Sequence, residues 1–98
     1  MSFTRIQDVL HAENCNLEAL AQQYATPLYV YSKAAFSKHY QDMDQAFSYI
    51  DHQICFAVKS NSNIAVLNVL AKLGSGFDIV TGGELARVLA AGGDPSKI

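Results

Sequence analysis

The sequence lacks an excess of positive charge and is poor in glycine and proline. Its 98 residues contain seven Lys and Arg against nine Asp and Glu, a formal net charge of -2, so no positive field collects phosphate backbones or anionic lipid. Six glycines and two prolines are too few for a collagenous or low-complexity chain. Nucleic acid and membranes are therefore not expected partners.

Long apolar runs, signal features and cysteine motifs are also missing. No apolar stretch is long enough for a bilayer span, and the first residues lack the basic region and apolar core of a secretory signal. Cys15 and Cys55 have no metal-ligand spacing, which predicts free, buried thiols in a reducing compartment and no metal. These absences predict a cytoplasmic protein.

The composition is typical of a globular segment with one domain at most. Half of the residues are hydrophobic and 16% are charged, and this length is well below the roughly 250 residues of a closed (β/α)8 barrel. Asn16 can cap a short helix over 16–24, and the apolar and aromatic residues 28–31, after Thr26-Pro27, predict a strand. Ser32 can cap a second helix, whose apolar stripe is Phe36, Tyr40, Met43, Phe47 and Ile50.

From residue 54 onward, short apolar runs alternate with segments of helical period. The runs 54–58 and 77–80 predict strands, and Ile98 is expected to open a third. A repeat of about 22 residues in strand-helix-strand order requires parallel strands. We therefore predict an α/β fold with two βα units, which is the amino-terminal part of a longer protein.

The two helices between these strands have recognisable ends. Ser62 or Asn63 can cap the first helix, and Gly74 stands where a left-handed residue would end it. The second begins with a capping box over 81–84 and ends before Gly92-Gly93. Both helices are therefore expected to start just after the carboxyl ends of the strands.

Lys59 directly follows the first apolar run, where parallel α/β proteins place their ligand sites. On position alone, such a lysine is more often a solvated charge. Asp78 is a second candidate, because a carboxylate within an apolar strand needs a hydrogen bond, a cation or a cofactor as its partner. Glu84 is a weaker candidate, since the capping box alone accounts for it.

Two linked segments resemble the fold-type III pyridoxal-phosphate decarboxylases. They are Ala57-Val58-Lys59-Ser60-Asn61-Ser62-Asn63 and Gly74-Ser75-Gly76-Phe77-Asp78-Ile79-Val80-Thr81-Gly82-Gly83-Glu84-Leu85, within a similarity that runs from Thr26 to Pro95. Ser60 and Thr81 stand where the family commonly has Ala and Ser, and both are small. The resemblance implies that residues 34–98 begin an alanine racemase-like (β/α)8 barrel, and that residues 1–33 associate with a β domain outside this sequence.

The resemblance also implies pyridoxal 5'-phosphate as cofactor, with Lys59 as the residue that bonds to its aldehyde. Asp78 and Glu84 match acidic positions beside the cofactor. Ala57, expected on the same strand face as Lys59, would leave room for the ring. The family's phosphate-binding glycine segment lies outside these residues, so Thr81-Gly82-Gly83 is not assigned to that role.

The function implied by the resemblance is decarboxylation of meso-2,6-diaminopimelate to L-lysine with release of CO2, by a full-length homodimer that shares its active sites across subunits. Other substrates stay open, since ornithine and arginine decarboxylases and alanine racemase carry a similar lysine. A non-catalytic barrel relative and an inactive truncated product are further alternatives. The 98 residues alone are expected to be inactive, because they lack the phosphate-binding and substrate-binding groups.

Overall fold

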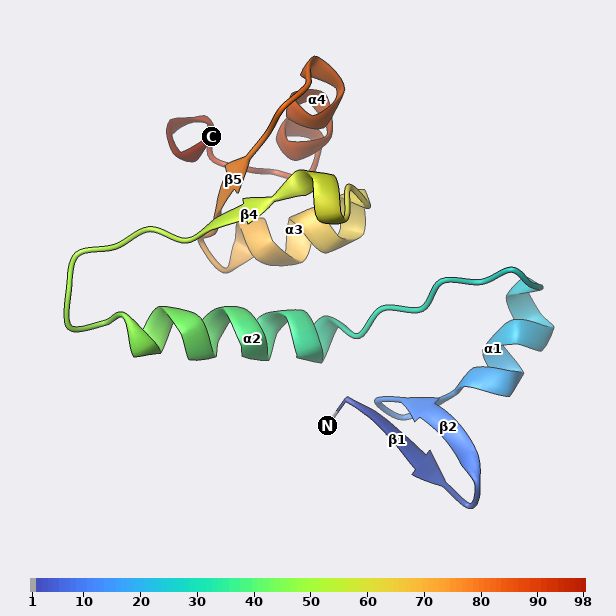
Figure 1. The fold of residues 1–98 in the computed structure, drawn as a ribbon. Helices are drawn as coiled ribbons and strands as arrows, with labels where there is room; N and C mark the ends of the chain where they lie inside the picture. Colours follow the sequence, from blue (N-terminus) through green and yellow to red (C-terminus); the bar gives the residue numbers. More distant parts are fainter. Residues whose placement is uncertain (1) are drawn as a thin grey trace. The chain divides into compact units, whose positions relative to one another are not determined.

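The computed structural model describes residues 2–98, which form two compact units, one up to residue 35 and one from 36 to 98 (Figure 1). In chain order the elements are β1 (Phe3–Ile6), β2 (Val9–Ala12), β3 (Cys15–Asn16), α1 (Leu17–Tyr24), α2 (Lys33–Ala46), β4 (Cys55–Ala57), η1 (Val58–Ser60), α3 (Ile64–Lys72), β5 (Gly76–Asp78), α4 (Gly82–Ala90) and η2 (Pro95–Lys97).

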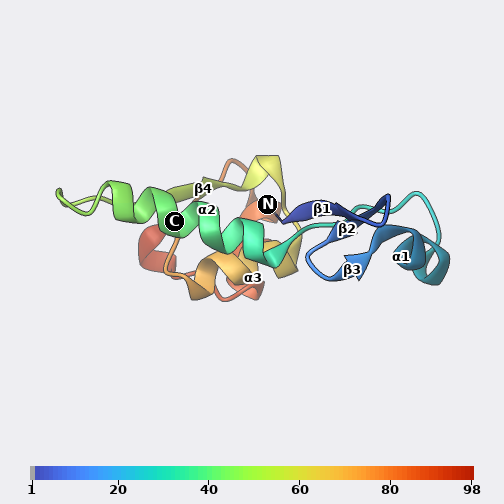
Figure 2. The same cartoon turned by 90° about the horizontal axis from the view of Figure 1, so that it is seen from below.

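The first unit contains an antiparallel sheet that the sequence did not predict. Its strand order is β1-β2-β3, with α1 directly after β3 (Figure 2). Gln7 and Asp8 join β1 to β2 with φ values of 50° and 65°, which is the turn geometry usually supplied by Asn-Gly. The predicted cap of α1 is confirmed, since the Ala19 amide donates to Asn16 Oδ1 at 3.0 Å.

The strand predicted over residues 28–31 is wrong. This segment has no strand partner among residues 2–98, and Tyr29 is 83% exposed. Residues that favour strands form one only where a neighbouring strand completes the hydrogen bonds. The next prediction is confirmed, because Ser32 caps α2 by accepting from the Ala35 amide at 3.1 Å, while its hydroxyl donates to Glu13 Oε2 at 3.0 Å.

The apolar stripe of the second helix is only partly used within the second unit. Phe36 and Tyr40 pack against its core. The helix ends at Ala46, so Phe47 and Ile50 lie in the turns beyond it, and both are exposed. The period of three and four residues therefore predicted the helix but overestimated its length.

The second unit confirms the two predicted βα units. Strands β4 and β5 are parallel, with Cys55 opposite Gly76 and Ala57 opposite Asp78. Asn63, not Ser62, caps α3, since its Oδ1 accepts from the amides of Ala65 and Val66. The third strand expected from Ile98 stays a prediction, because the sheet described in this unit has two strands.

Side chains from both strands and both helices form one core. The core consists of Phe77 of β5, the first residue of η1, apolar residues of α3 and α4, and the residue just after α4. The buried members are Val58, Val66, Leu67, Leu70, Phe77, Val88 and Ala91. The core therefore fixes the start of the segment that carries Lys59.

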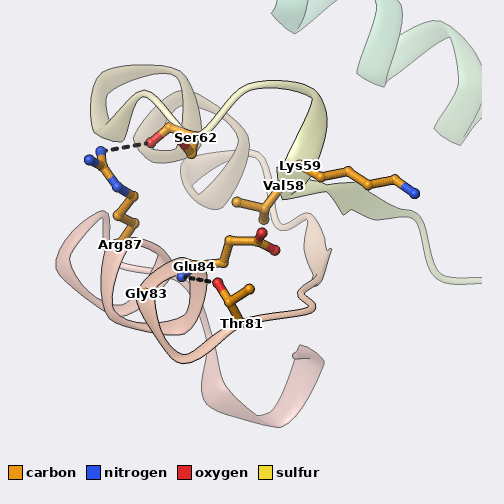
Figure 3. Close-up of a pocket in the computed structure, with 7 residues that line it drawn as sticks. All are labelled: Val58, Lys59, Ser62, Thr81, Gly83, Glu84 and Arg87. Carbon is orange, nitrogen blue, oxygen red and sulfur yellow. Dashed lines mark hydrogen bonds between the residues drawn. The ribbon is translucent and has the colours of Figure 1, made fainter.

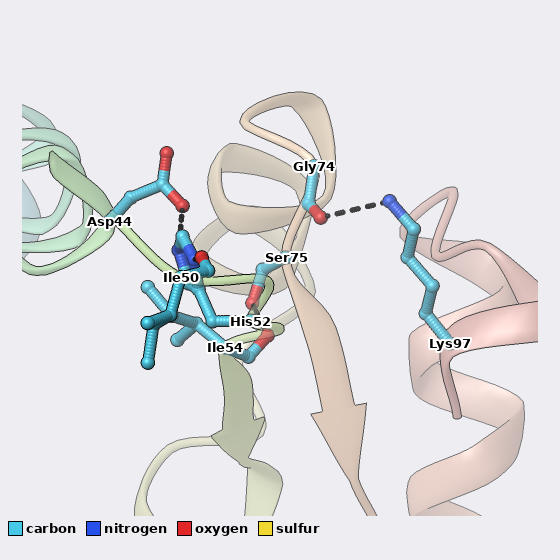
Figure 4. A network of polar contacts seen from close by, with 7 residues as sticks. All are labelled: Asp44, Ile50, His52, Ile54, Gly74, Ser75 and Lys97. Carbon is cyan, nitrogen blue, oxygen red and sulfur yellow. Dashed lines mark hydrogen bonds and ion pairs between the residues drawn. The ribbon is translucent and has the colours of Figure 1, made fainter. Parts of the chain in front are cut away.

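Polar contacts hold the amino ends of the two strands (Figure 4). The Gly76 amide donates to the Ile54 carbonyl at 2.8 Å, and Lys97 Nζ donates to the Gly74 carbonyl at 3.2 Å. His52 contacts the Ile50 carbonyl and Asp44 through its two ring nitrogens. Both contacts raise the pKa of His52, and the contact with the Ile50 carbonyl has the larger effect.

Three further predictions concern the cysteines, membrane spans and metal ions. Cys15 and Cys55 are free but exposed, so the prediction of buried thiols is wrong, because the short strands that carry them leave their side chains uncovered by other described residues. Within residues 2–98, no helix is long and apolar enough to cross a membrane. The same residues contain no group of three or more His, Cys, Asp or Glu placed to hold a metal ion.

Substitution of Gly93 tests how tightly this core is packed. A Cβ added there would overlap Val88 Cγ1 and lie 3.3 Å from Phe77 Cε2, so Gly93→Ala is expected to destabilise the full-length protein by about 1–3 kcal/mol through overpacking. Chemical denaturation measures the change. Gly82→Ala is the matched control, because an added Cβ meets nothing within 4 Å there, and an equal loss in both variants would contradict the packing argument.

Candidate functional site

Lys59 lies on the short 3₁₀ turn η1, just past the carboxyl end of β4. The turn is held locally, since Ser60 Oγ donates to the Ala57 carbonyl at 2.7 Å and the Asn61 amide donates to the Val58 carbonyl at 3.0 Å. Val58 is fully buried, whereas Lys59 is exposed. The core thus anchors the turn and leaves the amine accessible, at the position that the sequence predicted.

A pocket lies between η1 and the start of α4 (Figure 3). Its volume is about 340 Å³, at the lower end of the range for small-molecule sites. Figure 3 shows the Lys59 side chain extending away from the α4 residues, so Lys59 lines the pocket mainly through its base. The lining residues are Val58, Lys59, Ser62, Thr81, Gly83, Glu84 and Arg87.

The predicted capping box at the start of α4 is present in a shifted form. Thr81 Oγ1 accepts from the Glu84 amide at 3.1 Å, as expected. The Glu84 carboxylate accepts from the Val80 amide at 2.9 Å, one residue before the Thr81 amide that the usual box would use. In Figure 3 this carboxylate lies below Val58, inside the pocket. Glu84 therefore has a structural role and also presents an acceptor to the site.

Asp78 and Ala57 do not line this pocket. They are register partners at the carboxyl end of the sheet, so they lie side by side. Asp78 is exposed. Burial in an apolar strand therefore does not require its carboxylate to have a hydrogen-bond, cation or cofactor partner within the described residues. The expected shared face of Ala57 and Lys59 also loses its basis, because the strand ends at Ala57 and alternation does not continue through the 3₁₀ turn.

Sequence reasoning missed Arg87. Its Nη1 donates to the Ser62 carbonyl at 3.2 Å, across 25 residues of sequence. A signal was present, because residues three apart on a helix share a face, and Arg87 is three residues after Glu84. The pocket therefore contains a carboxylate and a guanidinium from the same face of α4.

The residues of this site fit a cofactor with an aldehyde group. Lys59 Nζ has no hydrogen-bond or ion-pair partner among the residues that the structure describes, and an unprotonated primary amine is the group that bonds to aldehydes. Lys59 could thus hold the cofactor, and Glu84 on α4 lines the same pocket. Asp78 lies opposite Ala57 at the carboxyl end of β5, outside the pocket lining.

The two roles of Glu84 can be separated by Glu84→Gln in the full-length protein. The amide oxygen of glutamine can still accept from Val80, so we expect the free energy of unfolding to change by less than about 1 kcal/mol. If the charge acts on the cofactor, the dissociation constant of pyridoxal phosphate or its pH dependence will change. Spectroscopic titration measures both, and an unchanged titration would leave Glu84 as a cap only.

Comparisons with known proteins agree with this geometry. Residues 33–98 match the family model of the pyridoxal-dependent decarboxylase pyridoxal binding domain. Diaminopimelate decarboxylase of Haemophilus influenzae is 62% identical over 89 residues, which are 91% of this chain and 21% of that protein. The chain thus spans about a fifth of the length of this curated relative.

Solved structures give the same result for the fold. The diaminopimelate decarboxylase of M. jannaschi superposes with a TM-score of 0.92 at 28% identity, over 98% of this chain and 24% of that chain. The Helicobacter pylori enzyme, complexed with L-lysine, superposes with a TM-score of 0.78 at 39% identity, over 84% of this chain and 21% of that chain. The two βα units are the start of a (β/α)8 barrel.

Proposed function

Because the chain belongs to the pyridoxal-dependent decarboxylase family, we propose that the full-length protein decarboxylates meso-2,6-diaminopimelate to L-lysine and releases CO2. The observation that carries the proposal is the accessible amine of Lys59, at the carboxyl end of β4 and at the edge of the pocket. Pyridoxal 5'-phosphate is the cofactor of this family. The 98 residues contribute only part of the active site.

Each candidate residue has a defined task in this proposal. When bound, pyridoxal phosphate supplies an aldehyde for amine attachment and a ring that stabilises the carbanion left by CO2. Lys59 holds the cofactor, and once its amine is released Nζ can hold or move a proton. In this proposal Glu84 and Asp78 supply negative charge toward the bound cofactor, and the small side chain of Ala57 would leave room for its ring.

Diaminopimelate is favoured over the other substrates by sequence similarity over 89 residues of this chain. The family also includes ornithine and arginine decarboxylases, as the name of its model states. However, curated relatives that are 62% and 61% identical to this chain are both diaminopimelate decarboxylases. The presence of Lys59 beside a pocket supports an enzyme over a non-catalytic relative.

The test is reduction of the full-length holoprotein with borohydride, followed by peptide mass spectrometry. The expected result is a pyridoxyl adduct on the peptide that contains Lys59. An adduct on another lysine, or no adduct, would contradict the proposed attachment. Assays with meso-diaminopimelate, ornithine and arginine then test the substrate, and we expect CO2 release from the first.

We also propose that the full-length protein is a cytoplasmic homodimer with shared active sites, and that residues 1–33 join a β domain formed by the rest of the protein. The support is the family resemblance and the compact unit of β1, β2, β3 and α1, whose own sheet contains only short strands. Light scattering of the full-length protein tests the dimer.

A further inference from the structure

The loop that follows Lys59 is held to α4 by one side chain. The other hydrogen bonds described for residues 60–63 join groups two to four residues apart: Ser60 to Ala57, Asn61 to Val58, Asn63 to Asn61, and Asn63 to the first turn of α3 that it caps. The bond from Arg87 Nη1 to the Ser62 carbonyl differs, because it links this loop to α4, 25 residues away in sequence. Local bonds set the shape of the loop, and among the hydrogen bonds of the described residues Arg87 is the one that relates it to α4.

The core fixes the two ends of the segment that contains this loop. Val58 is buried at its start, and Val66 is buried in the first turn of α3. The far end of α4 is tied separately, because Asn68 Nδ2 donates to the Ala91 carbonyl at 3.0 Å. Arg87 therefore provides a second tie from the last turn of α4, on the side of the pocket.

We propose that Arg87 is a positioning residue that holds the Lys59 loop at a fixed spacing from α4, and thereby sets the width of the pocket that receives pyridoxal phosphate. Arg87 and Glu84 lie on the same face of α4, and both line the pocket with Lys59. The Arg87 tie thus fixes the backbone of Ser62, three residues after Lys59, relative to the helix that carries Glu84. This inference rests on the proposed function.

The test compares Arg87→Met with wild type in the full-length protein. Arg87 is exposed, so its replacement leaves no cavity in the core. Lys97→Met is the matched control, because Lys97 Nζ also donates to a backbone carbonyl at 3.2 Å, across 23 residues of sequence, but outside the pocket. Thermal melts of both variants show whether their stability losses are alike.

Two readouts follow the loop and the cofactor separately. Hydrogen exchange of residues 60–63 in the cofactor-free protein is expected to be faster in Arg87→Met and unchanged in Lys97→Met. The dissociation constant of pyridoxal phosphate, measured by absorbance titration, is expected to rise about three- to tenfold in Arg87→Met only. Arg87→Lys, which keeps the charge but not the planar guanidinium, is expected to lie between wild type and Arg87→Met.

Unchanged exchange in Arg87→Met, or a dissociation constant equal to that of wild type or of Lys97→Met, would overturn the inference. A wild-type protein that binds no pyridoxal phosphate would overturn the proposed function and, with it, the cofactor part of this inference. The exchange experiment on cofactor-free protein still decides whether Arg87 holds the loop.

Discussion

Replacement of Lys59 by alanine in the full-length protein is expected to abolish covalent cofactor attachment and to lower decarboxylation by at least about 10²–10⁴-fold, because one side chain serves as both the nucleophilic amine and a proton carrier. The visible absorbance of lysine-bound pyridoxal phosphate should disappear. Absorbance spectra and CO2 release from meso-diaminopimelate measure the two effects independently.

Two further variants make the Lys59 result specific. Lys59→Arg keeps the positive charge but lacks a primary amine, so it should fail as completely as alanine. Lys72→Ala is the control, because Lys72 lies at the end of α3, away from the pocket, and it should keep wild-type absorbance. Covalent cofactor attachment and CO2 release that persist in Lys59→Ala would contradict the proposed role of Lys59.

The isolated 98-residue chain is expected to lack a cooperative fold. Its sheets are short, and in the second unit large apolar side chains lie in solvent, with Val80 73%, Ile50 48% and Leu89 47% exposed. Two parallel strands with open edges also invite pairing with other copies. We expect a broad thermal transition, binding of a hydrophobic dye and aggregation at high concentration.

The full-length protein is the control for that experiment, and its transition should be sharp. A soluble monomer of the 98 residues with a single cooperative transition would contradict this expectation. It would also show that the core around Phe77 is sufficient for cooperative folding, although few of the described residues are buried in it.

Local chemistry predicted the second unit well. The caps Asn63 and Thr81 and the left-handed Gly74 can be inferred from residue type at a helix end, and the structure has all three. The parallel pairing of β4 and β5 followed from the alternation of strands and helices. The caps depend on neighbours within a few residues, and the parallel pairing follows from the order of strands and helices along the chain, which is why the sequence alone was enough.

The errors arose where the outcome depended on partners distant in sequence. Residues 28–31 favour a strand but form none in the described part of the chain, whereas β1 and β2 pair through Gln7 and Asp8, which are uncommon turn residues. In the site, position placed Lys59 at the carboxyl end of a strand and the capping box placed Glu84 at a helix start, and the structure has both placements. Their roles toward the cofactor came from the family resemblance and stay predictions. The contact between Arg87 and Ser62 spans 25 residues and could not be inferred from spacing alone.

The polar contacts around Gly74, Lys97 and His52 gather at the end of the sheet where the strands begin, while the pocket lies where they finish. Substitutions around Gly74 should therefore alter the melting temperature without changing turnover. Substitutions near Ser62 should change turnover without altering the melting temperature. Stability could therefore be engineered at one end of this sheet without altering the residues of the pocket at the other end.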